Sequence, residues 1–191
     1  MSNIISIILA RGGSKRIPKK NLKKINGKTL VEISIDHSKK SKYINETIVS
    51  TDDDEIKLVS NSAGATVVDR PHHLRDDNTV NEADNILLDV IQKRLKKGLV
   101  DDIIVLLYPT APLRKTEYID KAIDKIKKDN CDSVLSLVKD HCYIWKEKNN
   151  LISPINYDYN NRVPSAVHDF TQYRENKSIY ACKSELLIKN K

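Results

Sequence analysis

Ile4–Leu9 reads IISIIL and leads directly into ARGGSKRIPKKN at positions 10–21, and this junction indicates the fold. A nearly continuous apolar run of this length is typical of a strand that is buried on both faces, as in parallel sheets. The pair Gly12-Gly13 follows the run and lets the backbone approach a bound group closely. Because successive backbone amides in such a turn can form a concavity for an anion, we predict a buried strand that leads into an anion-binding loop. The loop fits neither the GxxxxGK[ST] nor the GxGxxG pattern.

Short β-branched runs alternate with helical spacing as far as residue 138. Strands are expected at 4–9, 47–50, 65–68, 102–108, 133–138 and 178–182, and helices at 30–38, 56–63, 81–95 and 116–128. The acidic cluster at 52–55 is well placed to cap the second helix, because carboxylates favour the unpaired amides of a helix N-terminus. This alternation predicts an α/β fold with three layers (αβα, Rossmann-like) and a mainly parallel sheet.

The segment 141–172 departs from this rhythm. It is rich in Asn, Tyr and Pro, and we interpret it as an insertion, a hairpin that projects from the sheet of a single domain over 1–191. Ile144, Trp145 and several Tyr stand in an otherwise polar stretch, so they are candidates for an apolar patch that meets a partner.

The positive charge of the chain is concentrated near its N-terminus. The 191 residues carry a formal net charge of +7, but residues 1–50 contain eleven Lys and Arg against three Asp and Glu. A nucleic-acid-binding protein more often spreads its basic residues along a helix or groove, among aromatic side chains, so we expect no nucleic-acid partner. Arg11, Lys15, Arg16, Lys19 and Lys20 instead gather around the glycine pair, which suits a compact polyanion such as a triphosphate.

No apolar run approaches the roughly 20 residues that a membrane helix needs, and the first residues lack the features of a secretory signal. We therefore expect no membrane partner and a cytoplasmic location. The three cysteines, Cys131, Cys142 and Cys182, include no CxxC pair, which argues against a zinc site and a disulfide framework. We expect all three to be buried as small apolar residues.

Several segments resemble, in order, the motifs of the acylneuraminate cytidylyltransferases, also called CMP-sialic acid synthetases. Residues 9–21 match the N-terminal signature of that family almost throughout, IVSTD at 48–52 resembles its second strand, and RPHHLRDD at 70–77 resembles its next loop. LYPTAPLR at 107–114 is similar to LQPTSPLR, and YRENKSIY at 173–180 is similar to FRxNGxIY. The resemblance spans residues 4–182 and implies a nucleotidyltransferase fold.

The resemblance also implies a role for each matched residue. The catalytic residues would be Arg11, Lys15 and Lys20, and the nucleotide-binding residues would be Ala10, Gly12, Gly13, Ser14, Asn21, Arg70 and Asn81. The acid sugar would be bound by Tyr108, Arg174, Asn176 and Tyr180. The alternative for Tyr180 is a packed strand aromatic, and the alternative for Arg70 is a plain turn residue. Arg162 is a weaker candidate for recognition of the sugar carboxylate.

The implied reaction transfers CMP from CTP to the anomeric hydroxyl of a sialic-acid-like nine-carbon acid sugar and releases pyrophosphate. The implied cofactor is Mg²⁺, the implied partners are CTP and the acid sugar, and residues 141–172 would form a homodimer contact. In the family an Asp-x-Asp pair holds the metal, and its position falls beyond Lys191. We therefore expect that the C-terminal part of the family domain is missing, and the metal ligands are unknown.

Two departures from the family motifs bear on the substrate. Tyr108 stands where the family has Gln, and Lys177 stands where it usually has Gly. Legionaminic, pseudaminic or another variant acid is therefore as plausible as N-acetylneuraminic acid. Two alternative functions stay open: a related enzyme of the same fold that activates KDO or another sugar, and a truncated nucleotide-binding protein without catalysis.

Overall fold

The computed structural model describes residues 2–74, 82–164 and 171–189. It divides into two compact units. The first unit consists of residues 1–136 and 177–191, and the second consists of residues 137–176. The second unit includes the whole of the predicted insertion at 141–172.

Six strands form one sheet in the order β5-β4-β1-β6-β10-β7. The first four strands in that order are parallel, and β10 runs antiparallel to β6, with Ile179 opposite Leu107. The prediction of a mainly parallel sheet is therefore confirmed. The bounds of the strands are β1 (Ile4–Leu9), β4 (Glu46–Thr51), β5 (Thr66–Asp69), β6 (Ile103–Leu107), β7 (Ser133–Asp140) and β10 (Gln172–Lys183).

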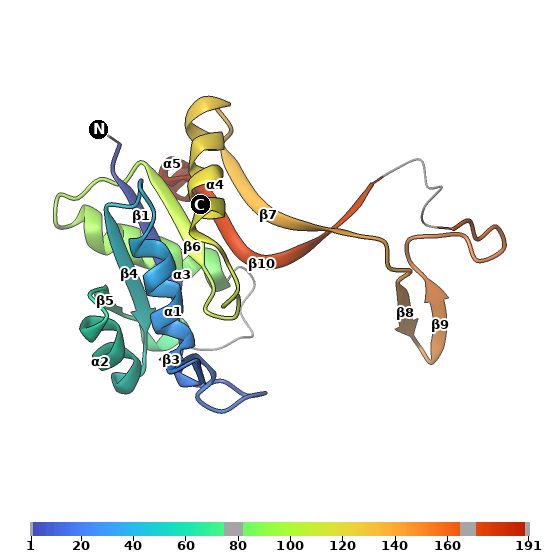
Figure 1. The fold of residues 1–191 in the computed structure, drawn as a ribbon, viewed down its shortest axis with the longest axis horizontal. Coiled ribbons are helices and arrows are strands. Elements are labelled where there is room, and N and C mark those ends of the chain that lie inside the picture. The colour runs from blue at the N-terminus through green and yellow to red at the C-terminus, as the bar shows by residue number, and fades with distance from the viewer. Residues whose placement is uncertain (1, 75–81, 165–170, 190–191) are drawn as a thin grey trace. The chain divides into compact units, whose positions relative to one another are not determined.

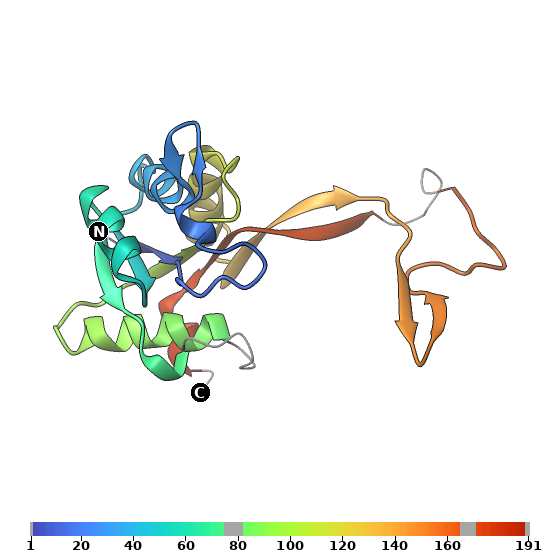
Figure 2. The same cartoon turned by 90° about the horizontal axis from the view of Figure 1, so that it is seen from below.

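Helices pack on both faces of this sheet (Figures 1 and 2). On β1, Ile4 and Ile8 join the apolar cluster under one set of helices, whereas Ile5 and Ile7 join the cluster under the other set. This alternation explains the nearly continuous apolar run, because both faces of the strand are buried. One set is α1 (Leu30–Lys39), α2 (Asp54–Ser62) and α4 (Thr116–Lys128), and the other is α3 (Glu82–Leu95) and α5 (Ser184–Lys189).

Short elements connect the first strand to the first helix. They are the 3₁₀ turn η1 (Lys20–Leu22) and the small hairpin of β2 (Lys24–Ile25) and β3 (Lys28–Thr29). Thr29 and Glu32 then begin α1 with a capping box, in which each side chain satisfies a backbone amide of the other residue. A second 3₁₀ turn, η2 (His72–Leu74), follows β5.

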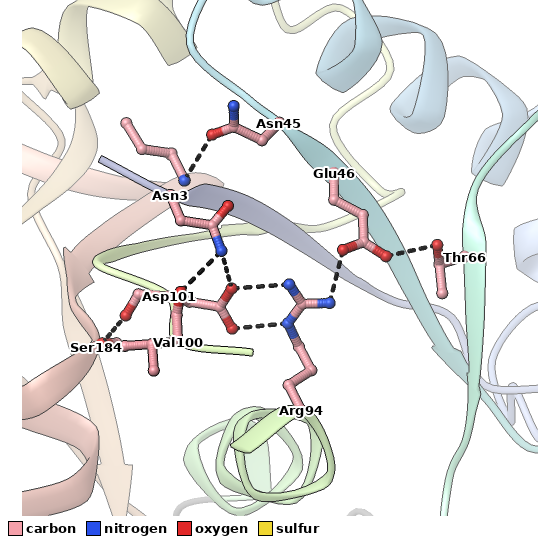
Figure 3. A network of polar contacts seen from close by, with 9 residues as sticks. Asn3, Asn45, Glu46, Thr66, Arg94, Val100, Asp101 and Ser184 are labelled. Atoms are coloured by element: carbon pink, nitrogen blue, oxygen red, sulfur yellow. Dashed lines mark hydrogen bonds and ion pairs between the residues drawn. The ribbon is translucent and has the colours of Figure 1, made fainter. Parts of the chain in front are cut away.

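The amino end of the parallel strands is closed by a buried polar network (Figure 3). The guanidinium of Arg94 on α3 donates to both carboxylate oxygens of Asp101, at 2.7 and 2.8 Å, and to Glu46 Oε2 at 2.6 Å. The side chain of Asn3 donates to the same Asp101 carboxylate at 2.8 Å, and Ser184 Oγ donates to the Asp101 carbonyl. The network joins α3, α5 and the starts of β1, β4 and β6 on the side away from the glycine loop.

The second unit contains the hairpin of β8 (Trp145–Lys148) and β9 (Leu151–Pro154). Its two turn residues, Asn149 and Asn150, both have positive φ, at 55° and 60°, as a tight hairpin turn requires. The rings of Tyr143 and Trp145 both pack edge-on against Tyr157, with centroids at 4.6 and 5.8 Å. The predicted hairpin is therefore present.

The cysteines are all free, but the expectation that all three are buried is wrong. Cys142 is exposed, and Cys131 and Cys182 are only partly buried, because Cys131 and Cys142 lie in the segments that flank β7 and Cys182 lies near the end of β10. Within the described ranges, no helix has the length and apolar character needed to cross a membrane.

Candidate functional site

The loop after β1 is fixed by the acidic residues that follow β4. The backbone N–H of Gly12 donates to Asp52 Oδ1 at 3.0 Å. A Cβ built on Gly12 would lie 2.4 Å from Asp53 Oδ2 and 2.8 Å from Asp53 Cβ, so no larger residue fits without a shift. At Gly13, by contrast, no atom of the described residues lies within 4 Å of such a Cβ. The first glycine is required by packing, and the second leaves open space over the loop.

Asp53 also performs the capping role predicted for the acidic cluster. Its Oδ1 accepts from the backbone N–H of Ile56 at 2.9 Å, at the N-cap position of α2. The loop and the start of α2 are therefore held by two adjacent carboxylates, because β1 and β4 are neighbours in the sheet. Sequence reasoning assigned the cap but missed the contact of Asp52 with the loop, which depends on strand order.

Lys20 lies close enough to Arg16 and Arg11 for their positive charges to act on it. Burial lowers the pKa of the Lys20 ammonium, and the positive charges of Arg16 and Arg11 lower it further. Lys15 is exposed to solvent on the same loop. A bound anion lowers the electrostatic repulsion within such a group of like charges, and a phosphate-binding loop needs this property.

Lys19, the fifth cation of the stretch, has a different partner. Its Nζ forms an ion pair with Glu55 of α2 at 2.5 Å, and its backbone has a left-handed φ of 51°. The cluster predicted around the glycine pair therefore consists of Arg11, Lys15, Arg16 and Lys20, with Lys19 directed to a carboxylate.

Asn21 and Ala10 support the loop from inside. The buried Asn21 side chain donates through Nδ2 to the backbone carbonyl of Arg11 at 2.9 Å. Ala10 is fully buried, and its N–H donates to Ser50 O at 3.1 Å. The N–H of Ser14 donates to Gly12 O at 2.8 Å and closes a tight turn. A direct contact of these three residues with a nucleotide stays a prediction, and their visible role is to shape the loop.

Arg70 connects the loop after β1 with the region of Tyr108. Its side chain is buried, and Nη2 donates to Ser50 O at 3.1 Å. The pKa of Arg70 is lowered, mainly by burial, and the carboxylates of Asp52 and Glu82 offset part of this lowering. Arg11 and Tyr108 also act on this guanidinium, so they lie near it. Arg70 is therefore not an exposed turn residue, and its contact with a nucleotide stays a prediction.

Tyr108 and Tyr180, two of the predicted sugar-binding residues, lie together. Their rings meet edge to face, with centroids 6.0 Å apart and planes at 82°. The contact arises because β6 and β10 are neighbours, and Tyr108 directly follows β6. Both side chains also pack against the apolar cluster under α3, so Tyr180 has the packing role named as its alternative, and a contact of either ring with the sugar stays a prediction.

The remaining predicted residues are placed as follows. Arg174 and Asn176 belong to the second unit, where Arg174 Nε donates to Asp140 Oδ2 at 2.9 Å. Arg162, also in this unit, stacks its guanidinium on the ring of Tyr143 at 4.2 Å. Asn81 lies outside the described residues.

The described residues do not form a metal centre by themselves. Within 2–74, 82–164 and 171–189, no three His, Cys, Asp or Glu side chains gather as metal ligands would. The three successive aspartates already have partners, since Asp52 accepts from Gly12, Asp53 caps α2, and Asp54 pairs with Lys57 at 2.9 Å. No chemical step is therefore assigned to a protein-held metal.

A mostly parallel sheet between helices, with a cationic loop at the carboxyl end of β1, defines an α/β nucleotidyltransferase fold. The solved CMP:2-keto-3-deoxy-manno-octonic acid synthetase in complex with CTP shares this fold, with a TM-score of 0.73 and 19% identity over 99% of this chain and 77% of that chain. The 4-diphosphocytidyl-2C-methyl-D-erythritol synthase of Anaerococcus prevotii shares it too, with a TM-score of 0.65 and 17% identity over 97% of this chain and 71% of that chain.

The chain belongs to the cytidylyltransferase family, whose sequence profile matches residues 5–188. It is 32% identical to N-acylneuraminate cytidylyltransferase A of Danio rerio, over 97% of this chain and 42% of that protein. It is also 32% identical to the CMP-N,N'-diacetyllegionaminic acid synthase of Legionella pneumophila, over 98% of this chain and 81% of that protein. The resemblance drawn from the motifs is therefore confirmed, and the chain spans less than half of the Danio rerio relative.

Proposed function

We propose that this chain is a cytidylyltransferase that transfers CMP from CTP to the anomeric hydroxyl of a sialic-acid-like nine-carbon acid sugar. Its similarity to proteins named for N-acylneuraminate, legionaminic acid and pseudaminic acid supports this class of substrate. The pseudaminic acid cytidylyltransferase of Campylobacter jejuni is 35% identical over 63% of this chain and 52% of that protein. Which acid sugar is used is left to the assay below.

The observation that carries the proposal is the group of Arg11, Arg16 and Lys20 on a loop whose backbone is tied to Asp52. The mutual repulsion of these cations falls when a polyanion binds among them. The triphosphate of CTP is such a polyanion, and its transfer reaction depends mainly on positioning and on neutralisation of charge.

In the proposed reaction the anomeric oxygen bonds to the α-phosphorus of CTP. The bond from that phosphorus to the bridging oxygen of the β-phosphate breaks, pyrophosphate leaves, and the hydroxyl proton is released. The loop cations would stabilise the charge that develops on the leaving oxygens. Tyr108 and Tyr180 would present ring faces and hydroxyl groups to the sugar.

Mg²⁺ belongs to the proposal as an ion carried by the CTP phosphates. Mg²⁺ commonly binds through one or two carboxylates together with substrate phosphates and water. The ion would add charge neutralisation at the phosphates. A turnover rate that is insensitive to EDTA would remove Mg²⁺ from the proposal.

A homodimer formed through the second unit is the proposed assembly. Trp145, Leu151 and Ile152 of the hairpin are 50%, 73% and 68% exposed, an unusual exposure for apolar side chains on neighbouring strands. A monomeric mass at micromolar concentration would refute the dimer without affecting the proposed reaction. The proposed location of the reaction is the cytoplasm.

The test is release of pyrophosphate from CTP, with Mg²⁺ and a panel of N-acetylneuraminic, legionaminic, pseudaminic and KDO acids. The proposal expects release that depends on one or more of the nine-carbon acids, with formation of the matching CMP-sugar. Release with KDO alone would support the related sugar-activating function instead.

Nucleotide binding without turnover is the second candidate. Calorimetric binding of CTP, together with no pyrophosphate release from any acid in the panel, would select it.

A further inference from the structure

Arg114 is a buried cation that the proposed reaction does not use. It ends the LYPTAPLR segment, between β6 and α4, and its side chain is only 6% exposed. Burial lowers its pKa to about 10, so it stays charged at neutral pH. No ion pair among the described residues includes Arg114, and in the same ranges its Nε has no hydrogen-bond acceptor.

The two Nη groups of this guanidinium donate to backbone carbonyls and to a hydroxyl instead of to a carboxylate. Nη1 donates to Ser178 O at 2.6 Å, and both Nη atoms approach Tyr108 O, at 3.4 and 3.3 Å. Nη2 also donates to Ser34 Oγ on α1 at 3.0 Å. One planar group thus connects β10, the end of β6 and a helix. A buried charge without a counter-charge is a costly way to gain stability, which favours a role in geometry.

The position of this bridge in the sheet is specific. The antiparallel ladder of β6 and β10 ends at the pair Leu107 and Ile179. The next two residues along the same register are Tyr108 and Ser178, and the carbonyls of these two accept from Arg114. The guanidinium therefore continues the pairing of the strands by one step beyond their own hydrogen bonds.

Tyr108 and Tyr180 both lie at or next to the strand position that Arg114 bridges. Tyr108 is itself one of the bridged residues, and Tyr180 lies two residues after Ser178 on the same strand. Their rings meet at 6.0 Å. A relaxation of the bridge would separate the two strand ends and with them the two rings.

We infer that Arg114 is a positioning residue that holds Tyr108 and Tyr180 in register to receive the acid sugar. The expected effect of Arg114 on sugar binding rests on the proposed function. Its effect on the placement of the two tyrosine rings can be tested without turnover. Lysine cannot replace the side chain, because a single ammonium lacks the fork that reaches two carbonyls and a hydroxyl together.

Arg94 provides a matched control. It is 7% exposed and also connects several elements, but it lies in the network at the amino end of the strands (Figure 3). Arg114→Ala and Arg94→Ala therefore each remove a buried guanidinium from the same unit. If Arg114 only stabilises the fold, the two variants should behave alike once they are compared at equal fractions folded.

The structural readout is the ¹⁹F spectrum of protein labelled with 3-fluorotyrosine, with signals assigned through Tyr108→Phe and Tyr180→Phe. We expect Arg114→Ala and Arg114→Lys to shift or broaden both signals, and Arg94→Ala to leave them in place. Unchanged signals in the folded Arg114 variants would overturn the inference, whether or not the wild type turns over any sugar.

The kinetic readout separates the two substrates. In Arg114→Ala the KM for the acid sugar should rise by about tenfold or more, because small displacements of positioning groups are costly, while the Kd for CTP stays within about twofold. Added guanidinium ion at a non-denaturing concentration should partly restore the sugar KM. The positioning role of Arg114 would be refuted if Arg114→Ala weakened CTP binding as much as it raised the sugar KM. It would also be refuted if Arg94→Ala raised the sugar KM equally. A wild-type protein without turnover would instead refute the proposed function.

Discussion

The backbone N–H of Gly12 points at the carboxylate of Asp52, which lies 3.0 Å away across the carboxyl ends of β1 and β4. This contact joins two segments that are separated by forty positions in the sequence. It fixes the loop before any ligand arrives, so the nearby cations need little rearrangement to meet an anion. Three of the predictions below follow from this arrangement.

Gly12→Ala should distort the loop. The new Cβ would lie 2.4 Å from Asp53 Oδ2, so the loop or the cap of α2 has to shift. We expect a destabilisation of about 1–3 kcal/mol, typical of an overpacked site, in thermal or urea unfolding. The matched control is Gly13→Ala, whose Cβ meets no described atom within 4 Å. Equal stability losses in the two variants would contradict the role given to Gly12.

Lys20→Ala should strongly reduce catalysis and leave the fold intact. The side chain belongs to the cation group with Arg11 and Arg16 and takes no part in the apolar core. We expect kcat/KM to fall by about 100-fold, the scale for loss of one charge-stabilising group. Lys19→Ala is the control, because it removes an equal charge one residue away that is already paired with exposed Glu55. A Lys20→Ala variant with the wild-type rate would remove the loop from the proposed mechanism.

Asp52→Asn and Asp52→Ala test whether this carboxylate holds the loop through Gly12 or binds a metal ion. Asn keeps an oxygen that accepts from Gly12, whereas Ala keeps none. If Asp52 holds the loop, Ala should weaken CTP binding by about tenfold, since the loss of one hydrogen bond to a charged group is of that order, and Asn should weaken it less. The concentration of Mg²⁺ at half-maximal rate should be unchanged in Asp52→Asn. A large rise in that concentration would identify Asp52 as a metal ligand.

His37 should make the stability of the protein fall on mild acidification. Burial, with the positive charge of Arg114 as the next cause, lowers the pKa of His37 below its ordinary 6.5, and the buried Nδ1 has no hydrogen-bond partner among the described residues. The unfolded chain therefore binds this proton more readily, so stability is lost as the pH falls below about 6.5. The melting temperature of the wild type should drop more between pH 7.5 and 5.5 than that of His37→Gln. Parallel pH profiles would contradict this assignment.

The strands were predictable where both of their faces are buried. Ile4–Leu9 matches β1 in full, and the helix expected at 116–128 matches α4. The first part of β10 was missed, since Gln172–Lys177 is polar and mostly exposed and its strand form depends on a neighbour. The short helix α5 was also missed, because six residues are too few for intrinsic helix propensity to give a signal.

The site was predictable in its local part only. The glycine pair and the loop cations are adjacent in sequence, so their meeting needs no knowledge of strand order. The partner of Gly12 and the bridge of Arg114 depend on which strands become neighbours, and this information is not contained in any single segment. The same reason explains why Lys19 was grouped with the other cations, although Glu55 of α2 is its partner.

The place of β10 between β6 and β7 has a consequence for the order of folding. Residues 133–140 are synthesised well before residues 172–183, yet among the described strands β7 joins the sheet only through β10. A nascent chain can thus assemble β1, β4, β5 and β6 early, while the open side of β6 waits for a strand made much later. Unpaired strand edges favour association between chains, so the edge of β6 is most exposed to association with other chains in the interval before β10 emerges from the ribosome.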